Sequence, residues 1–319
     1  MSNFAFLRSA EWAFLFEPAS KAEELANTDA RASCFYARRT LELGVAWLYK
    51  HDKALKLPYQ DNLSALLHEP TFRQTAGDAL FTKARLIKDL GNMAVHGAKK
   101  MSPADAINTT RELFHFCYWL VRNYGRTARP DPGQRFDANL LPGASAQPVQ
   151  SVEQLQKLEG ELRAKDEHLA ALLADKTALS EKLKKLREEV AAAKKANAVQ
   201  PDTHDYSEAE TRKLFIDTLL KEAGWVLNPG TCFEVEVSGM PNAENKGYVL
   251  WGDDGKPLAL IEAKRTTKSP TLGQQQAKLY ADCLEAQYGQ RPVIFYSNGY
   301  EHWIWNDADY PPRAVQGFY

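Results

Sequence analysis

The chain has 319 residues, of which 44% are hydrophobic and 25% charged, so it is long enough for two or three domains with ordinary cores. Its formal net charge is −1, which excludes binding of nucleic acid through an overall basic surface and leaves only a local patch. The four cysteines lie far apart without a CxxC pair, which argues against a zinc site or a disulfide framework. Since no run approaches the roughly 18 apolar residues of a membrane span and no signal peptide is evident, we expect a soluble cytoplasmic protein that does not contact membranes.

Residues 1–125 carry apolar residues at helical spacing and predict an all-helical domain. The clearest helices are expected over residues 32–50, 86–96 and 104–124. The last of these follows Ser102-Pro103, a capping residue and a proline suited to the first turn. Residues 126–150 contain four prolines among small residues, which predicts a linker or a loop along the surface.

Residues 151–200 carry the most regular pattern of the sequence. Its apolar positions follow steps of three and four over five heptads, broken by Lys165 and Lys176. We call these positions the leucine seam: Leu155, Leu158, Leu162, Leu169, Leu172, Leu179, Leu183, Leu186 and Val190. The seam predicts a coiled coil or a long helical arm, with self-association as one way to cover it. A single solvated helix is the alternative, but it would leave the leucines exposed.

Residues 201–319 change character and predict a small α/β domain. An amphipathic helix over 207–223 is followed by three strand-like runs, CFEVEVSGM, GYVLWG and PLALIEAKR. A helix over about 272–288 and two further strands, PVIFYSNG and HWIWN, complete the pattern. The whole chain is therefore expected to be a multidomain α plus α/β protein.

The segment YVLWGDDGKPLALIEAK holds the residues with the most distinctive chemistry. Two apolar strands flank Asp254-Gly255, a strong signal for a tight hairpin. Alternation along the second strand places Glu262 and Lys264 on the same face, at its end. A carboxylate that holds Mg²⁺ beside a lysine that orients water suits hydrolysis of a phosphodiester. The same two side chains can also form a plain surface ion pair, which contributes little.

This segment, followed by GQQQAKLYAD, resembles the PD-(D/E)xK nuclease fold and, more narrowly, the nuclease domain of type I restriction subunits. The resemblance implies Mg²⁺-dependent endonuclease cleavage of double-stranded DNA. It makes Glu262 a metal ligand and Lys264 the catalytic lysine. It assigns Gln276 and Tyr280 to the accessory Q-x3-Y motif, and Glu210 becomes an auxiliary acid that can also bind the metal.

One departure from the family concerns the first hairpin strand, where the family places an aspartate. If the hairpin closes on Asp254-Gly255, paired residue numbers sum to 509 and Glu262 faces Gly247, which has no side chain to share a metal. Asp253 and Asp254 lie at the turn, several residues away, and Glu244 or Glu236 are weak substitutes. We therefore expect an intact fold with weak or absent cleavage.

The resemblance also implies partners and a larger assembly. Arg265, Lys268 and Lys278 are the expected DNA contacts near the nuclease site. Type I restriction subunits act with methylation and specificity subunits and continue into ATP-driven motor domains. Because no GxxxxGK[ST] loop occurs here, ATP would bind only in motor domains missing from this chain, and we interpret the chain as an N-terminal fragment. Two other interpretations are a stand-alone defence nuclease that dimerises without a motor, and a non-catalytic adaptor that keeps a degenerate nuclease fold to bind DNA or a partner.

The helical domain contains a second group of polar residues. Asn92 and His96 lie four residues apart, behind Arg85 and Gly91. This arrangement resembles the HEPN group of helical domains, some of which cleave RNA through a histidine, although that group places an arginine where Gly91 stands. We expect a non-catalytic HEPN-like domain in which Asn92 and His96 form a buried, hydrogen-bonded pair.

Overall fold

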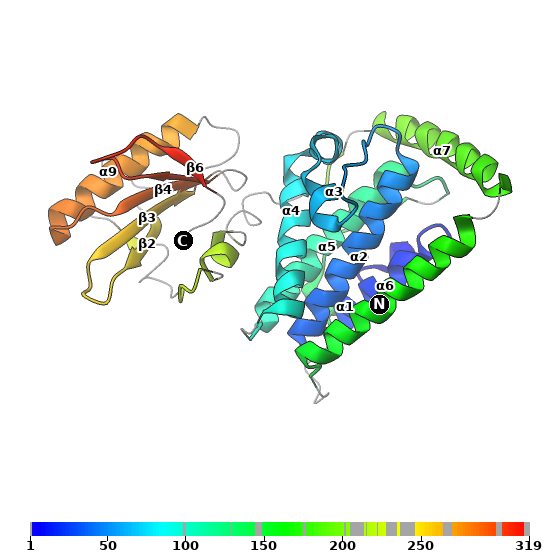
Figure 1. Cartoon of the computed structure of the whole chain (residues 1–319), viewed down its shortest axis with the longest axis horizontal. Coiled ribbons are helices and arrows are strands. Elements are labelled where there is room, and N and C mark those ends of the chain that lie inside the picture. The colour runs from blue at the N-terminus through cyan, green and yellow to red at the C-terminus, as the bar shows by residue number, and fades with distance from the viewer. Residues whose placement is uncertain are drawn as a thin grey trace. The chain divides into compact units, whose positions relative to one another are not determined.

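The chain divides into two compact units: unit 1, Met1–Tyr206, and unit 2, Ser207–Tyr319 (Figure 1). The computed structural model describes residues 2–97, 100–127, 129–143, 149–174, 177–200, 202–204, 214, 216–221, 223–227, 235–236, 246–263, 270–297 and 302–315. Unit 1 is helical and unit 2 combines helices with a sheet, which confirms the predicted combination of α and α/β parts. None of the helices within these ranges is both long enough and apolar enough to cross a membrane.

The core of unit 1 is a bundle of helices. They are α1 (Ala13–Leu25), α2 (Ala30–His51), α3 (Leu63–His68), α4 (Pro70–His96) and α5 (Pro103–Tyr124), with two short 3-10 helices, η1 (Ala5–Arg8) and η2 (Ala138–Leu140). The helices predicted over 32–50 and 104–124 are confirmed as parts of α2 and α5. The one predicted over 86–96 is only the end of α4. Gly77, at a φ of 80°, interrupts α4 and separates the predicted part from its first turns.

The helix starts follow from local capping chemistry. Ser102 accepts a hydrogen bond from the Asp105 amide, and the Asp105 carboxylate accepts one from the Ser102 amide, so these two amides at the start of α5 are satisfied. Pro103 occupies the first turn, as predicted. Asp29 caps α2 by accepting from the Ala32 amide.

Helix α2 packs closely against its neighbours because glycines stand at the crossing points. A Cβ placed on Gly91 of α4 would lie 2.3 Å from the Cβ of Arg38 on α2, and one on Gly44 of α2 would lie 2.7 Å from the Phe116 ring of α5. Both distances are far below normal contact distances. Small residues at these positions therefore set how near the helix axes can come.

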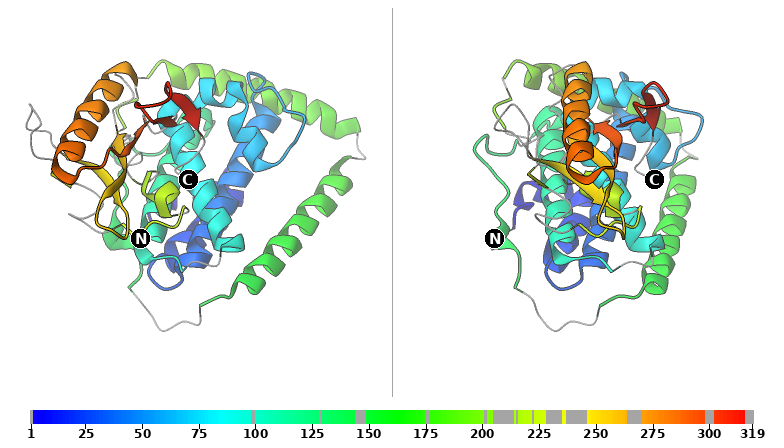
Figure 2. Two further views of the ribbon diagram at one scale, coloured as in Figure 1. Left: turned by 60° about the vertical axis from the view of Figure 1, so that its left-hand side comes forward. Right: turned by 90° about the vertical axis from the view of Figure 1, so that its left-hand side faces the viewer.

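Residues 151–200 form two helices of unit 1, α6 (Val152–Ala174) and α7 (Thr177–Ala198). Figures 1 and 2 show that they extend in different directions and do not lie along one another. α6 packs against α4, and α7 packs against α5 and α2. The leucine seam is partly covered by the bundle itself, since Leu155 and Val190 are buried against it. A partner from another chain stays a prediction.

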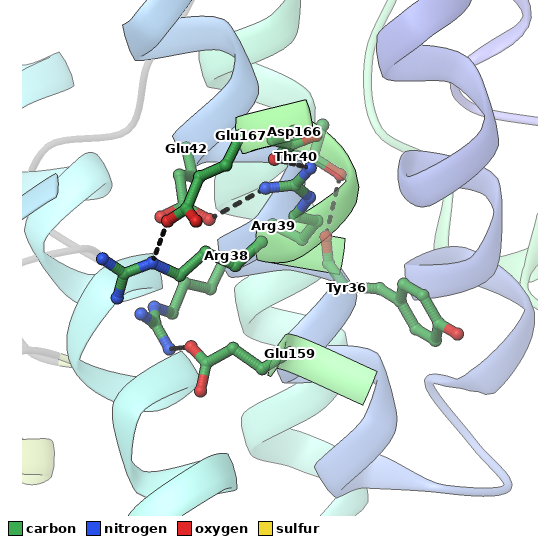
Figure 3. A network of polar contacts seen from close by, with 9 residues as sticks. Tyr36, Arg38, Arg39, Thr40, Glu42, Glu159, Asp166 and Glu167 are labelled. Carbon is green, nitrogen blue, oxygen red and sulfur yellow. Dashed lines mark hydrogen bonds and ion pairs between the residues drawn. The ribbon is translucent and has the colours of Figure 1, made fainter. Parts of the chain in front are cut away.

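Ion pairs hold α6 to α2, as Figure 3 shows. Arg38 contacts Glu159 at 2.7 Å, and Arg39 contacts Asp166 at 2.5 Å. Arg39 also pairs with Glu42 on its own helix at 3.3 Å. Because the two carboxylates of α6 remain partly exposed, each pair contributes only about 0–1 kcal/mol, and the contact depends on salt.

The described part of residues 126–150 follows the surface of unit 1, one of the two predicted alternatives. Asn3 and Asp137 exchange hydrogen bonds through backbone and side chain at 2.8 and 3.0 Å. The Asn27 side chain donates to the Pro142 carbonyl, and the Gln150 amide donates to Asp29. These bonds replace the water contacts that an extended loop would otherwise need.

Unit 2 is built on a mixed sheet with strand order β1-β2-β3-β4-β5-β6. The strands are β1 (Val235–Glu236), β2 (Lys246–Trp251), β3 (Pro257–Ala263), β4 (Val293–Ser297), β5 (His302–Trp305) and β6 (Arg313–Val315). β3 and β4 are parallel and joined through α9 (Pro270–Tyr288), whereas the other neighbours are antiparallel. The predicted strands are present, but the sequence did not indicate β6.

Different elements pack against the two faces of this sheet. On one face α9 packs against an apolar cluster. Its buried members are Val249, Leu260, Ala277, Tyr280, Ala281, Leu284, Ile294 and Tyr296. Tyr248, on the other face, donates its hydroxyl to Asp217 at 2.9 Å, within the helical residues 216–221. The sheet therefore lies between two helices, as predicted for an α/β domain.

Candidate functional site

The β2–β3 hairpin brings the main candidate residues together, and its turn differs from the predicted one. Gly252 N donates to Lys256 O at 2.8 Å, so three residues form the loop, with Gly255 at a φ of 74°. Such a loop ends in a left-handed residue and a bulge. The pairing indeed shifts between Leu250 and Trp251. The closure on Asp254-Gly255 as a two-residue turn was therefore wrong.

Beyond this bulge, the predicted register is confirmed. Tyr248 pairs with Ile261, Val249 with Leu260, and Leu250 with Ala259, so each pair sums to 509. One further step in this register places Glu262 opposite Gly247. On its other side, Gly247 pairs with Val235 of β1. The two positions that flank Gly247 across the sheet are thus a carboxylate and a valine.

Glu262 lies on the α9 face of the sheet near the end of β3. Alternation puts it on the same face as Leu260, and its parallel partner is Tyr296, which belongs to the apolar cluster of that face. Glu262 is only 5% exposed. Burial of a carboxylate is costly unless other groups compensate for it. A glutamate in this position therefore differs from the solvated strand end of the plain ion-pair interpretation.

Helix α9 carries Gln276 and Tyr280, the residues expected to form a Q-x3-Y motif. Tyr280 is fully buried in the apolar cluster, and Gln276 is half-buried one turn earlier. Because β3 and β4 are parallel, the connecting α9 runs opposite to them, so its earlier residues lie toward the end of β3. Gln276 and Glu262 therefore both lie toward the same edge of the sheet, the edge at which β3 ends. The prediction that the motif residues share one helix face is confirmed.

The other predicted residues are not all at this place. Lys264, Arg265, Lys268 and Glu210 lie outside the described residues. Lys278 is exposed and lies about 200° around α9 from Gln276, so it is on the solvent side of the helix. Its role as a DNA contact stays a prediction.

The two weak substitutes for the missing aspartate are Glu236 and Glu244. Glu236 pairs with Lys246 in the backbone ladder between β1 and β2, next to the Val235–Gly247 pair. Its weak candidacy as a substitute stays a prediction. Glu244 lies outside the described residues.

The described side chains do not by themselves fit Mg²⁺. This ion needs near-octahedral oxygen coordination, usually with more than one carboxylate or a phosphate. Glu262 contributes one carboxylate, and Gly247 opposite to it contributes none. Within the described part of the chain, no three His, Cys, Asp or Glu side chains group closely enough to hold a metal ion.

A polar pair that the sequence did not indicate lies on the opposite face of the same sheet. Ser297 and His302 are cross-strand partners, and the serine hydroxyl lies 2.9 Å from His302 Nδ1. Both residues are buried. Their spacing of five residues across a hairpin carries no motif, so only the strand pairing reveals them.

Unit 1 contains a buried polar cluster that the sequence did not indicate either. Lys83 of α4 and Glu112 of α5 form an ion pair at 2.6 Å with almost no exposure. His115 Nδ1 lies 3.0 Å from His204 Nε2, and His204 stacks on Tyr118. Burial, together with the charges of Lys83 and other neighbours, lowers the pKa of His115 to about 2. The ring is therefore neutral at physiological pH.

The expected Asn92–His96 pair is not formed as a buried pair, since His96 is exposed and Asn92 is half-buried. The structure also explains the glycine before Asn92. Arg38 of α2 occupies the space that a side chain on Gly91 would need. An arginine at this position, as in the catalytic HEPN motif, is therefore sterically incompatible with the observed packing.

Comparison with known families gives one match. Residues 20–128 are similar to the family described as Domain of unknown function (DUF4145). The matched range starts within α1 and ends just after α5, so it spans the helical bundle of unit 1. No curated protein and no solved structure matched the chain.

Proposed function

We propose that unit 2 is a nuclease-fold module of the kind found in type I restriction subunits, which binds double-stranded DNA in the cytoplasm and cleaves it weakly or not at all. The observation that carries the proposal is the register of β2 and β3. It sets a buried glutamate opposite a glycine, on the sheet face that packs against the Q-x3-Y helix. The sequence resemblance from about Tyr206 to Tyr319 supports the same assignment.

The burial of Glu262 supports a chemical role rather than a structural one. An apolar side chain at this position would extend the cluster formed by Leu260 and Tyr296 and avoid the desolvation of a carboxylate. Type I restriction subunits place an aspartate where Gly247 stands. We infer that the loss of this second oxygen donor weakens metal binding, which lowers the cleavage rate and leaves the fold intact.

The test restores the missing carboxylate. Nicking of supercoiled plasmid by the full chain in Mg²⁺ is compared between the wild type, Gly247→Asp, and Gly247→Asp combined with Glu262→Gln. The single variant is expected to raise the nicking rate on the order of 100-fold, because it completes a pair of carboxylates. The double variant is expected to return to the wild-type rate.

A control places a carboxylate at the neighbouring position of the same strand, with a charge change of two units instead of one. Lys246→Asp puts a carboxylate one residue away, where alternation turns it from Glu262. It should leave nicking at the wild-type level. If Gly247→Asp folds and still does not cleave, the proposal fails and a non-catalytic adaptor is favoured. Efficient cleavage by the wild type would also contradict it.

A further inference from the structure

A pocket of about 390 Å³ lies in unit 1 between the end of α2 and the last turns of α7. From the α2 side it is lined by His51, Asp52 and Lys53, and from α7 by Val190, Lys194 and Lys195. Alanine side chains complete its walls. This volume falls within the range of small-molecule sites.

The charges in the pocket favour an anion. Asp52 is already satisfied: its Oδ2 accepts from Lys194 at 2.5 Å and from the Tyr124 hydroxyl at 2.7 Å. Burial opposes its ionisation, but these hydrogen bonds outweigh burial and hold the pKa of Asp52 below its ordinary value. Lys53 and Lys195 are exposed and have no ion-pair partner within the described ranges. Two positive charges therefore remain available to a ligand.

His51 adds an uncharged acceptor. Its Nδ1 lies 2.8 Å from the Trp47 carbonyl, so Nδ1 carries the proton and Nε2 keeps a lone pair. The ring stacks on Trp47 at 4.5 Å. Burial lowers the pKa of His51, and the charges of Lys50 and Arg187 act in the same direction. A neutral ring that cannot donate from Nε2 suits a ligand hydroxyl or amine group.

We propose that this pocket binds a nucleoside 5′-monophosphate. The phosphate monoester carries about −1.5 to −2 charges at neutral pH, which matches Lys53 and Lys195 better than the single charge of a phosphodiester does. Val190 and the alanines contact the apolar faces of the nucleoside, and His51 accepts from one of its hydroxyl or amine groups. The same chemical group occurs on a free nucleotide and on the 5′-phosphorylated end of a DNA strand. The proposal concerns unit 1 and does not depend on the nuclease assignment of unit 2.

Binding at this place has a consequence for α7. Since α7 supplies half of the pocket, a ligand binds only when α7 is docked on the bundle. At a concentration 100 times the Kd, the ligand should slow the opening of α7, measured as amide hydrogen exchange, by about 100-fold.

Isothermal titration of the full chain tests the proposal with AMP, adenosine, inorganic phosphate, and oligonucleotides with and without a 5′-phosphate. AMP should bind at least about 10-fold more tightly than adenosine and inorganic phosphate, because neither of these fills both parts of the site. Lys53→Met combined with Lys195→Met should weaken AMP binding by about 100-fold, with an unchanged circular dichroism spectrum. Lys182→Met is the matched control, since it removes a lysine from the opposite side of α7 and should have no effect.

The proposal is overturned if AMP shows no saturable binding, if adenosine or inorganic phosphate binds as tightly as AMP, or if the double lysine variant binds AMP like the wild type. Tighter binding of the 5′-phosphorylated oligonucleotide than of AMP would support the proposal with a DNA end as the ligand. The reverse order would support it with a free nucleotide.

Discussion

Buried charged side chains have different surroundings in the two units. In unit 1, Lys83 and Glu112 neutralise each other across two helices at 2.6 Å, so the pair is part of the packing between α4 and α5. In unit 2, Glu262 is buried at the end of β3, and the facing position on β2 is a glycine. A buried charge with its counter-charge on a neighbouring helix indicates a structural role. For a carboxylate buried at a strand end opposite a glycine we propose a site instead, and single substitutions can separate the two cases.

The largest expected effect comes from breaking the pair of unit 1. Lys83→Met should lower the free energy of opening of α5 by about 2–5 kcal/mol, because the buried carboxylate of Glu112 loses the ammonium group and keeps the more exposed Arg111 at 3.2 Å. Hydrogen exchange of the α5 amides measures this. Lys21→Met is the control: it breaks the exposed pair with Glu17 and should cost less than about 0.5 kcal/mol. Equal effects of both variants would contradict a structural role for the buried pair.

The second prediction tests whether the close packing of α2 against α4 contributes to the stability of unit 1. Gly91→Ala should destabilise α4 by about 1–3 kcal/mol, because its new methyl group meets Arg38. Gly160→Ala in α6 is the matched change, since nothing lies within 4 Å of its added Cβ. It should stabilise the helix by about 0.5–1 kcal/mol. Thermal unfolding compares them, and a Gly91→Ala variant that unfolds at the wild-type temperature would show that α2 and α4 can separate without cost.

The sequence predicted the helices whose apolar spacing is regular and the strands that alternate. The capping box at Ser102 and the register of β2 with β3 followed from local chemistry, which needs only neighbouring residues. The turn at Gly255 differed by one residue, since a three-residue loop and a bulge give the same register farther along the strands. Helix α1 was not singled out because Pro18 stands inside it, and strand β6 was missed because it has only three residues.

The candidate site could be predicted only as far as strand pairing and helix faces determine it. The sharing of one face by Gln276 and Tyr280 follows from their spacing, and so does the position of Lys278 on the far side. The cluster of Lys83, Glu112 and His115 could not be predicted, because it joins α4 to α5 through packing that no local pattern encodes. The pocket beside His51 likewise depends on where α7 docks.

The smallest expected effect is the most informative for unit 2. Glu262→Leu should leave the free energy of opening of β3 unchanged or raise it by about 1 kcal/mol, because a leucine extends the apolar cluster and no carboxylate has to be desolvated. Hydrogen exchange of β3 amides in the full chain gives this value. Leu260→Ala, on the same strand and face, is the matched control and should cost about 2–5 kcal/mol, which shows that the measurement reports on this sheet. If Glu262→Leu lowers the free energy of opening of β3 by more than about 2 kcal/mol, Glu262 is a structural charge like Lys83 and Glu112. The difference between the two units would then disappear.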